Sequence, residues 1–427
     1  MAEARAGSWV PGADGSGFGI ENLPYGVVRR GGAAPLTAVR IGAFALDLAA
    51  VAGSGLLAVP ELDPGVFSEP TLNAFLGSGA QVWSATRARL CELLRSGGTG
   101  ATEARESLRR ALIPLEQLTP LLPVRVGDYV DGYASIEHAT NVGRLLRPDG
   151  EPLPPNWRHL PIAYHGRAGT LIASGSEVPR PWGQRASAEP GGPPSFGPER
   201  RLDFELELGF LTGPGPARGE PIPAARAAEH IFGVVLVNDW SAREIQRWES
   251  APLGPNLGKS FATSVSPWIV PLEALHPARV AGVEQRPAPL PYLRGDEPWA
   301  LDIGLEATIT PEASGVETRV TATNARGLYW SAPQQLAHAT SGGASVAAAD
   351  LFASGTISGA TPDSLGCLLE RTRGGRDQIL LEDGSARTFL EDGDTVTMRG
   401  YCEAARISFG ELTGRVVPSS ARSGFQE

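Results

Sequence analysis

Acidic residues at alternate positions are the first candidates for chemistry in this sequence. Asp203, Glu205 and Glu207 lie in an alternating run at 202–211, so in a β-strand their carboxylates would share one face. A solvated face of an antiparallel sheet is one interpretation. The other is a bound divalent cation, because adjacent like charges repel and the run contains no Arg or Lys to offset them. Oxygen-only ligands of this kind suit Ca²⁺ or Mg²⁺ rather than zinc.

Another acidic residue, Asp239, follows a continuous apolar run at 231–237 that indicates a buried strand. Ser241 and Glu244 come next and form a capping-box pattern, which predicts that a helix begins there. Asp239 would therefore lie between the end of a strand and the start of a helix. It could cap the helix or bind a metal ion, and the sequence favours neither role.

Lys259 is the only lysine among the 37 basic residues of the chain. Nucleotide composition explains an excess of arginine, and chance could leave one lysine. Lysine is nevertheless a compact point charge and arginine a larger planar group, so we hypothesise that Lys259 occupies a site that excludes a guanidinium. Arg243 and Gln246 are further donors, three residues apart on one face of the predicted helix. They could hold an oxyanion, or Arg243 could pair with an acid.

A polar segment at 127–143 offers a possible general base, His138. A lone histidine is more often structural than catalytic, and nothing in this segment would activate it. Any partner must come from a distant part of the chain, and Glu370 is one candidate. The same segment also contains Asp128, Asp131, Tyr133 and Asn141.

Composition indicates an ordinary globular protein of two or three domains, with 427 residues, 42% of them apolar and 20% charged. The net charge of −10 disfavours nucleic-acid binding, which needs a basic surface. Three scattered cysteines favour neither a disulfide framework nor a zinc site. We expect a cytoplasmic protein with no membrane partner, since neither a signal core nor an apolar span is evident.

The chain divides into two parts by pattern. Residues 1–118 combine short strands with helices at 81–95 and 102–113, which predicts a small α+β unit. Residues 119–427 consist of short apolar runs between turns rich in Gly and Pro, which predicts a large β-rich domain. The candidate catalytic residues above all lie in this part, so we expect it to be the catalytic domain. The expected fold class is α+β, mainly β.

Taken together, several spaced motifs are similar to those of the fumarylacetoacetase family. They are Asn-Leu-Pro-Tyr-Gly at 22–26, His-Ala-Thr-Asn-Val-Gly at 138–143, Tyr-His-Gly-Arg at 164–167, Phe-Glu-Leu-Glu at 204–207, Asn-Asp-Trp-Ser-Ala-Arg at 238–243, Gly-Lys-Ser at 258–260 and Ser-Gly-Thr-Ile-Ser-Gly at 354–359. The resemblance implies an SH3-like N-terminal domain, a C-terminal β-sandwich roll and a homodimer. It also implies hydrolysis of the carbon–carbon bond of 4-fumarylacetoacetate, the last step of tyrosine and phenylalanine degradation.

The resemblance assigns roles to individual positions. It implies calcium ligands at Asp131, Glu205, Glu207 and Asp239, and a magnesium site at Asp239, Lys259 and Thr263. It implies a general base, His138, oriented by Glu370, and oxyanion donors at Arg243, Gln246 and Lys259. The substrate, a small diketo acid, is expected to contact Tyr133, Arg147, Tyr164, Gln246, Ser250 and Thr356.

Two positions depart from the family pattern. Ser250 replaces a usual tyrosine and Gly132 a usual aromatic residue, so we expect a pocket enlarged at its edge. The alternative functions are a related acylpyruvate hydrolase, an oxo-acid isomerase or decarboxylase, and a non-catalytic calcium-binding scaffold.

Overall fold

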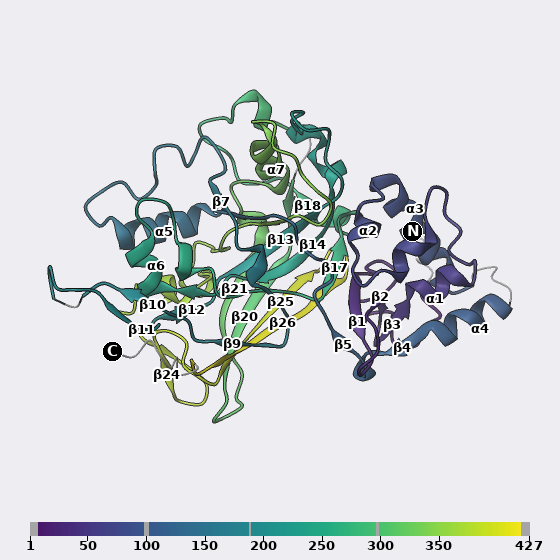
Figure 1. Cartoon of the computed structure of the whole chain (residues 1–427), viewed down its shortest axis with the longest axis horizontal. Helices are drawn as coiled ribbons and strands as arrows, with labels where there is room; N and C mark the ends of the chain where they lie inside the picture. The colour runs from purple at the N-terminus through teal and green to yellow at the C-terminus, as the bar shows by residue number, and fades with distance from the viewer. Residues whose placement is uncertain (1–6, 98–101, 188, 296–298, 420–427) are drawn as a thin grey trace.

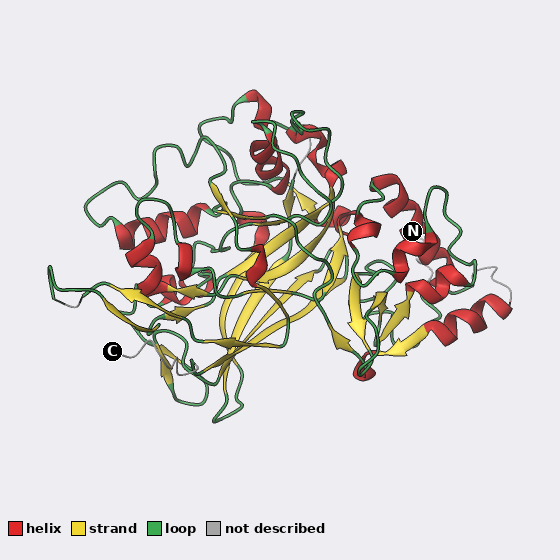
Figure 2. Ribbon diagram, in the orientation of Figure 1, coloured by secondary structure: helices red, strands yellow, loops and turns green. Residues whose placement is uncertain are grey.

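The computed structural model describes residues 7–97, 102–187, 189–295 and 299–419. Two β-sheets form the centre of the molecule, and helices and long loops cover them (Figures 1 and 2). The N-terminal unit lies at one end, purple and at the right in Figure 1. Among the described residues, no helix combines the length and apolar character needed to cross a membrane.

The N-terminal unit is an antiparallel meander packed against helices. Its core contains Val39, Leu46, Phe75 and Leu90, all buried. The strands are β1 (Tyr25–Arg29), β2 (Leu36–Ile41), β3 (Phe44–Asp47), β4 (Leu112–Pro114) and β5 (Thr119–Pro120). The helices are α1 (Leu48–Gly53), α2 (Asn73–Leu76), α3 (Ala80–Leu94) and α4 (Thr102–Ala111). The predicted helices at 81–95 and 102–113 are thus present, the second ending before β4.

This meander continues into the larger unit, because β1 pairs with β17 (Trp268–Pro271) through Tyr25↔Ile269. The division expected between residues 118 and 119 falls just before β5, which also pairs with β1. The sheet continues from β17 through β14 (Ile231–Asn238), β13 (Leu206–Thr212), β22 (Leu351–Ala353), β6 (Tyr129–Gly132) and β7 (Ala163–His165). Beside β14 lies β16 (Thr263–Val265), which pairs with β8 (Leu171–Ala173).

The second sheet packs against β13, β14 and β16 and encloses the main core with them. Leu236, Met398 and Phe409 lie between the sheets and are fully buried. The two packed sheets make the larger unit a β-sandwich, as the family resemblance implied. The strand order is β21 (Thr318–Asn324), β20 (Gly304–Pro311), β25 (Asp394–Cys402), β26 (Ile407–Val417) and β9 (Ser176–Pro179).

Short elements surround the sandwich and carry several site residues. The helices are α5 (Ile136–Leu146), α6 (Arg243–Glu249), α7 (Ala332–Thr340) and α8 (Leu368–Arg371). The two-stranded ribbons are β10 (Trp182–Arg185) with β11 (Ser195–Pro198), β12 (Leu202–Asp203) with β15 (Ser241–Ala242), β18 (Arg279–Val280) with β19 (Ala300–Leu301), and β23 (Ile379–Leu380) with β24 (Ala386–Arg387).

The acidic run at 202–211 is not the continuous strand that its alternation predicts. It breaks after β12 and resumes at Leu206 as β13. The solvated-face interpretation is also wrong, because Asp203, Glu205 and Glu207 are 0%, 6% and 0% exposed. Cations from distant segments pair with Asp203 and Glu205, and a local sequence pattern does not reveal such partners.

The helix predicted after Asp239 is present as α6, but Ser241 does not cap it. The Ser241 hydroxyl donates to the carbonyl oxygen of Asp239, 2.9 Å away. The first turn of α6 is instead capped by Glu199, whose carboxylate accepts from the backbone N–H groups of Glu244 and Ile245 at 3.2 and 3.1 Å. A carboxylate at a helix N-terminus also complements the helix dipole. Asp239 therefore does not cap α6.

Trp240 links the site strand β14 to the opposite sheet. A Cβ added to Gly414 of β26 would lie 2.5 Å from Cζ2 of Trp240, closer than carbon atoms pack. We predict that Gly414→Ala lowers the free energy of unfolding by about 1–3 kcal/mol, because adding a methyl group to a well-packed core typically costs that much. Urea denaturation measures it, with Gly304→Ala in β20 as control, where the nearest atom would be 3.6 Å away. Equal stability of the two variants would contradict this packing.

Candidate active site

Most of the residues singled out in the sequence line a cleft of about 750 Å³. Its floor is one edge of the large sheet, where neighbouring strands end together. Asp131 of β6 pairs with Ala353 of β22, and Ala353 pairs in turn with Gly209 of β13. On the other side of β13, Leu206 pairs with Asn238, the last residue of β14. This register brings Asp131 of β6, Glu207 of β13 and Asp239, which directly follows β14, to the same edge.

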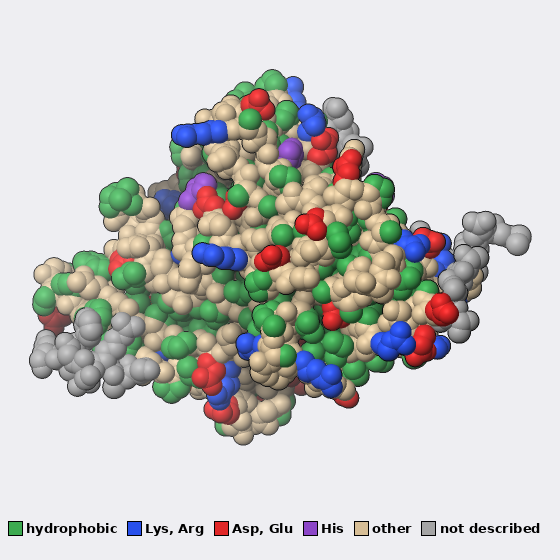
Figure 3. All heavy atoms as spheres, turned by 45° about the vertical axis from the view of Figure 1, so that its right-hand side comes forward, with side chains coloured by type: hydrophobic (Ala, Val, Ile, Leu, Met, Phe, Trp, Pro, Cys, Tyr) green, Lys and Arg blue, Asp and Glu red, His purple; other side chains and the backbone are tan. Residues whose placement is uncertain are grey.

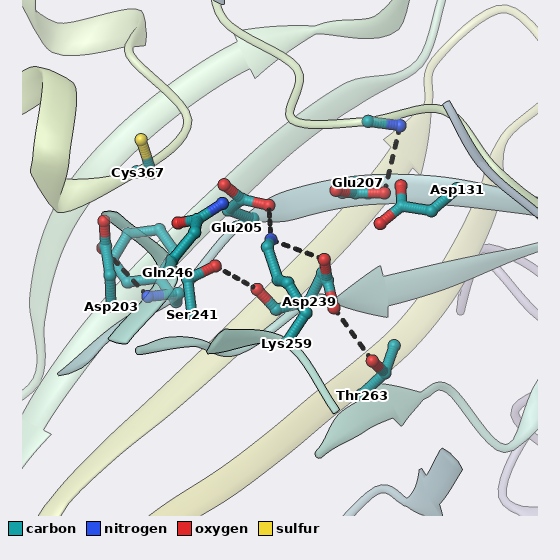
Figure 4. A network of polar contacts seen from close by, with 12 residues as sticks. Asp131, Asp203, Glu205, Glu207, Asp239, Ser241, Gln246, Lys259, Thr263 and Cys367 are labelled. Carbon is teal, nitrogen blue, oxygen red and sulfur yellow. Dashed lines mark hydrogen bonds and ion pairs between the residues drawn. The ribbon is translucent and has the colours of Figure 1, made fainter. Parts of the chain in front are cut away.

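Asp131, Glu207 and Asp239 form a buried group that fits a hard cation. One carboxylate oxygen from each lies within 4.8 Å of the others. Oδ1 of Asp131 and Oε1 of Glu207 are buried and accept no hydrogen bond from any described residue. The two side chains face each other in Figure 4. Unpartnered, buried carboxylate oxygens that converge are the donor set that Ca²⁺ or Mg²⁺ takes.

Burial and mutual repulsion disfavour the charged forms of Asp131 and Glu207, whereas at Asp239 the charges of Arg167 and Lys259 outweigh burial and lower the pKa. Burial, then the charge of Asp239, raises the pKa of Asp131 to about 7 despite the opposing effect of Arg167. Burial, followed by repulsion from Asp131 and Asp239, raises the pKa of Glu207 well above its usual range. A bound cation would reverse both effects.

Glu205 lies beside the three-carboxylate group, but its oxygens are already paired with cations. Lys259 contacts Oε2 of Glu205 and lies 2.5 Å from Oδ2 of Asp239 (Figure 4). Arg243 Nη1 lies 2.8 Å from Oε1 of Glu205. The hydroxyl of Thr263 donates to Oδ1 of Asp239 at 2.9 Å. Glu205 and Asp239 are thus both paired with cations, and the expected role of Glu205 as a fourth calcium ligand stays a prediction.

Lys259 is fully enclosed and charged. Burial would lower its pKa, but Asp239 and Glu205 outweigh burial and raise it. An ammonium group has no lone pair to offer a metal ion. Lys259 is 2% exposed and contacts two carboxylates, which agrees with the hypothesis that this site needs a compact cation.

Asp203 has a structural role and does not join the metal group. Arg243 donates from Nε to its Oδ2 at 2.9 Å. Its oxygens also accept from the backbone N–H groups of Leu368 and Leu369, at 2.7 and 2.9 Å, and so cap α8. The idea that one cation is shared by all three carboxylates of the run is therefore wrong for Asp203.

Arg167 is a site residue for which no sequence pattern indicated a role. Its Nη2 lies 2.6 Å from Oδ2 of Asp131 and 2.9 Å from Oδ1 of Asp239. The guanidinium also lies 4.8 and 5.0 Å from the ring centroids of Tyr129 and Tyr164. The motif at 164–167 contains this arginine, but only the fold shows that it turns back onto acids from two other strands.

His138 and Glu370, 232 residues apart in the chain, form a buried pair. Nδ1 of His138 lies 2.6 Å from Oε2 of Glu370. Ser358 Oγ donates to the same oxygen at 2.7 Å, and Asn141 Nδ2 donates to Oε1 at 2.9 Å. Burial opposes ionisation of Glu370, but His138 and these hydrogen bonds outweigh it and lower its pKa. An ionised Glu370 keeps the proton on Nδ1 and leaves Nε2 as a base.

Most residues expected to bind substrate line the same cleft, with one exception. Arg147 is exposed, is not a lining residue, and donates to the backbone carbonyl oxygens of Glu151 and Pro152. Thr356 has a buried hydroxyl with no hydrogen-bond partner among the described residues, which leaves it available to a ligand. The lining residues are Tyr133, Tyr164, Gln246, Ser250 and Thr356.

The expected enlargement of the pocket does not occur at Gly132. A Cβ there would lie 2.7 Å from Oε1 of Gln335 and 2.9 Å from the carbonyl oxygen of Ala353, so neighbouring groups already fill the space. Ser250 is exposed at the C-terminus of α6 and its hydroxyl donates to the carbonyl oxygen of Gln246. Of the two positions, only Ser250 is exposed at the cleft, and there the expected enlargement stays a prediction.

Comparison with known proteins gives full-length matches. The family described as Fumarylacetoacetase N-terminal matches residues 21–123, and the one described as Fumarylacetoacetate (FAA) hydrolase C-terminal matches 128–417. The chain is 45% identical over 417 residues to fumarylacetoacetase of Bos taurus, covering 96% of this chain and 99% of that protein. It is 44% identical over 415 residues to that of Homo sapiens, with the same coverage.

Solved structures share the fold at low sequence identity. A fumarylacetoacetate hydrolase from Exiguobacterium antarcticum matches with a TM-score of 0.53 and 14% identity, over 93% of this chain and 99% of that chain. A maleylpyruvate hydrolase from Sphingobium matches with a TM-score of 0.51 and 16% identity, over 93% and 100%. The predicted fold class is confirmed.

Metal binding should release protons at neutral pH. Asp131, with a pKa of about 7, is partly protonated there, and a cation needs its ionised form. We therefore predict that Ca²⁺ affinity falls as the pH is lowered through 7. Calorimetry in two buffers with different ionisation enthalpies measures the released protons, with the exposed Asp128→Asn as a control that behaves like the parent chain. Binding heats that are identical in both buffers would contradict the prediction.

Arg167 should stabilise the metal-free protein and compete with the metal. Replacing it with methionine leaves Asp131 and Asp239 with less compensating charge, and loss of one partner of a buried ion pair costs about 3–5 kcal/mol. We predict that Arg167→Met lowers the melting temperature without metal and increases the rise caused by Ca²⁺. Thermal denaturation with and without Ca²⁺ tests this against the exposed Arg144→Met. A smaller rise in Arg167→Met than in the parent chain would refute it.

Proposed function

We propose, from the premise that this chain belongs to the fumarylacetoacetase family, that it hydrolyses the carbon–carbon bond of 4-fumarylacetoacetate to fumarate and acetoacetate. This reaction completes the degradation of tyrosine and phenylalanine. The observation that carries the proposal is the cleft itself, in which the His138–Glu370 pair and the three-carboxylate group converge.

The chemical difficulty is the leaving group. Cleavage of a β-diketone expels a carbanion, which water stabilises poorly. A divalent cation held by Asp131, Glu207 and Asp239 would supply a Lewis acid that stabilises negative charge on the diketone oxygens. We propose Ca²⁺ for this group. The second ion expected, Mg²⁺, would lie beside Asp239 and Thr263 with Lys259 as a neighbouring charge, since an ammonium is not a ligand.

His138 is the proposed general base. Its Nε2 takes a proton from water, and the resulting hydroxide adds to the carbonyl carbon of the bond to be broken. That carbon–carbon bond then breaks, and the electron pair passes to the departing acetoacetate carbon. His138 then donates the proton it holds to that carbon, which yields acetoacetate. Glu370 keeps the ring oriented and stabilises the imidazolium that forms between the two transfers.

Donors around the cleft floor are proposed to stabilise the tetrahedral oxyanion. Arg243 Nη1 donates to Oε1 of Gln246 at 3.1 Å, which orients the Gln246 amide so that its N–H groups are free to donate. Lys259 supplies positive charge at the floor. Losing one donor of this kind typically reduces the rate by about 10²–10³.

Remaining parts of the proposal rest on the family resemblance. They are a homodimer, a cytoplasmic location and substrate contacts from the cleft-lining residues, with Arg147 reaching the substrate only if its side chain moves. A related acylpyruvate hydrolase and a calcium-binding scaffold are the competing functions. Steady-state turnover of fumarylacetoacetate and of a shorter 2,4-diketo acid, with and without a chelator, separates the three. A scaffold would turn over neither, and an acylpyruvate hydrolase would prefer the shorter acid.

Removing the base should abolish chemistry and spare the metal group. We predict that His138→Ala lowers kcat by about 10²–10⁴, the usual contribution of a general base, while Ca²⁺ affinity stays within twofold of the parent chain. The fall in absorbance of fumarylacetoacetate measures turnover, and calorimetry measures Ca²⁺ binding. The exposed His159→Ala is the matched control and should keep full activity. Undiminished turnover in His138→Ala would remove this residue from the mechanism.

A further inference from the structure

Arginines form the mouth of the cleft, although the chain as a whole carries a charge of −10. They come from the end of β10, the turn before β12, α6 and the loop after α8. We call them the arginine rim: Arg185, Arg200, Arg201, Arg247, Arg373 and Arg376. On the face shown in Figure 3, by comparison, acidic and basic side chains are interspersed.

Acidic residues neutralise only part of this rim. Glu244 is shared by three arginines, lying 2.7 Å from Arg200, 3.8 Å from Arg185 and 3.9 Å from Arg201. Arg373 pairs with Asp377 at 2.5 Å. The rim is therefore positive overall, since six guanidinium groups face two carboxylates.

Arg247 and Arg376 are the members of the rim that form no ion pair with any described residue. Both are exposed, and neither has a carboxylate within 4.0 Å among the residues that the structure describes. Arg247 is on α6, one residue after Gln246 of the proposed oxyanion donors. Their charges are consequently available to a ligand that enters the cleft.

The cleft thus has two regions of opposite character. Its floor carries the acids that fit a metal ion, and its mouth carries unneutralised arginines. The proposed substrate has a diketone at its centre and a carboxylate at each end. When the diketone reaches the floor, a carboxylate remote from the bond to be cleaved must extend back toward the mouth.

We infer, resting on the proposed function, that the arginine rim binds this remote carboxylate and that Arg247 and Arg376 select dianionic diketo acids over monoanionic ones. Guanidinium groups suit carboxylates by charge and planar geometry. A local positive region in an acidic protein also attracts dianions that the net charge repels. The rim acts at a distance from the reacting atoms, so it affects substrate capture rather than the chemical step.

The test compares two substrates in the full-length, metal-loaded protein. Fumarylacetoacetate is the dianion, and 2,4-dioxopentanoate is a monoanion whose carboxylate adjoins the diketone. We expect the double variant Arg247→Gln, Arg376→Gln to raise KM for the dianion about three- to tenfold, as loss of two exposed charge pairs would. Its kcat and its kcat/KM for the monoanion should stay within twofold of the parent chain. Arg218→Gln, exposed and outside the cleft lining, is the control.

Ionic strength supplies a second readout. Since exposed charges are screened within about 10 Å at 0.1 M salt, kcat/KM for the dianion should fall with added salt in the parent chain. The fall should be shallower in the double variant, with an unchanged melting temperature to show that both fold alike. Equal effects on both substrates, or an unchanged salt dependence, would overturn the role of the rim. No turnover of fumarylacetoacetate by the parent chain would overturn the proposed function itself, and with it this inference.

Discussion

Negative charge buried beneath the cleft is the constraint on which the site depends. An unpaired carboxylate is costly to bury, so each must find a cation or take up a proton. Five buried acids lie here with three cations, and four of the acids contact a cation whereas Glu207 contacts none of the described ones, which leaves 5 − 3 = 2 negative charges in excess. One divalent cation would balance that excess. The acids are Asp131, Asp203, Glu205, Glu207 and Asp239, and the cations are Arg167, Arg243 and Lys259.

The architecture of the sheet accounts for where these charges meet. Neighbouring strands of the large sheet end at one edge, and three acids from different parts of the chain lie in or directly after β6, β13 and β14 there. The cations come from turns and helices that cover this edge. The His138–Glu370 pair joins α5 and α8 over the same cleft, so a base and a candidate metal group share one chamber.

Local sequence patterns predicted individual elements better than they predicted contacts. The apolar run at 231–237 and the helix after Asp239 are both present, because local composition determines such elements. The solvated acidic face and the Ser241 cap were wrong, because both depend on partners from distant segments. Arg167 had no local signal at all. Its role follows from a turn that brings it back onto Asp131 and Asp239.

The family resemblance supplied what local patterns could not, namely which distant residues meet. It predicted the His138–Glu370 pair, which lies at 2.6 Å. It did not predict that Glu205 is already paired with cations, or that neighbouring groups fill the space beside Gly132. Such details depend on side-chain packing, and two chains with the same motifs can differ in them.

The most direct measurement of the central claim is a crystal structure of the chain grown with Ca²⁺, in which anomalous scattering locates the ion. The account predicts one cation within about 2.3–2.6 Å of carboxylate oxygens of Asp131, Glu207 and Asp239, with Arg167 displaced from them. Absence of a cation there, with Arg167 still bound to Asp131 and Asp239 at saturating Ca²⁺, would contradict it.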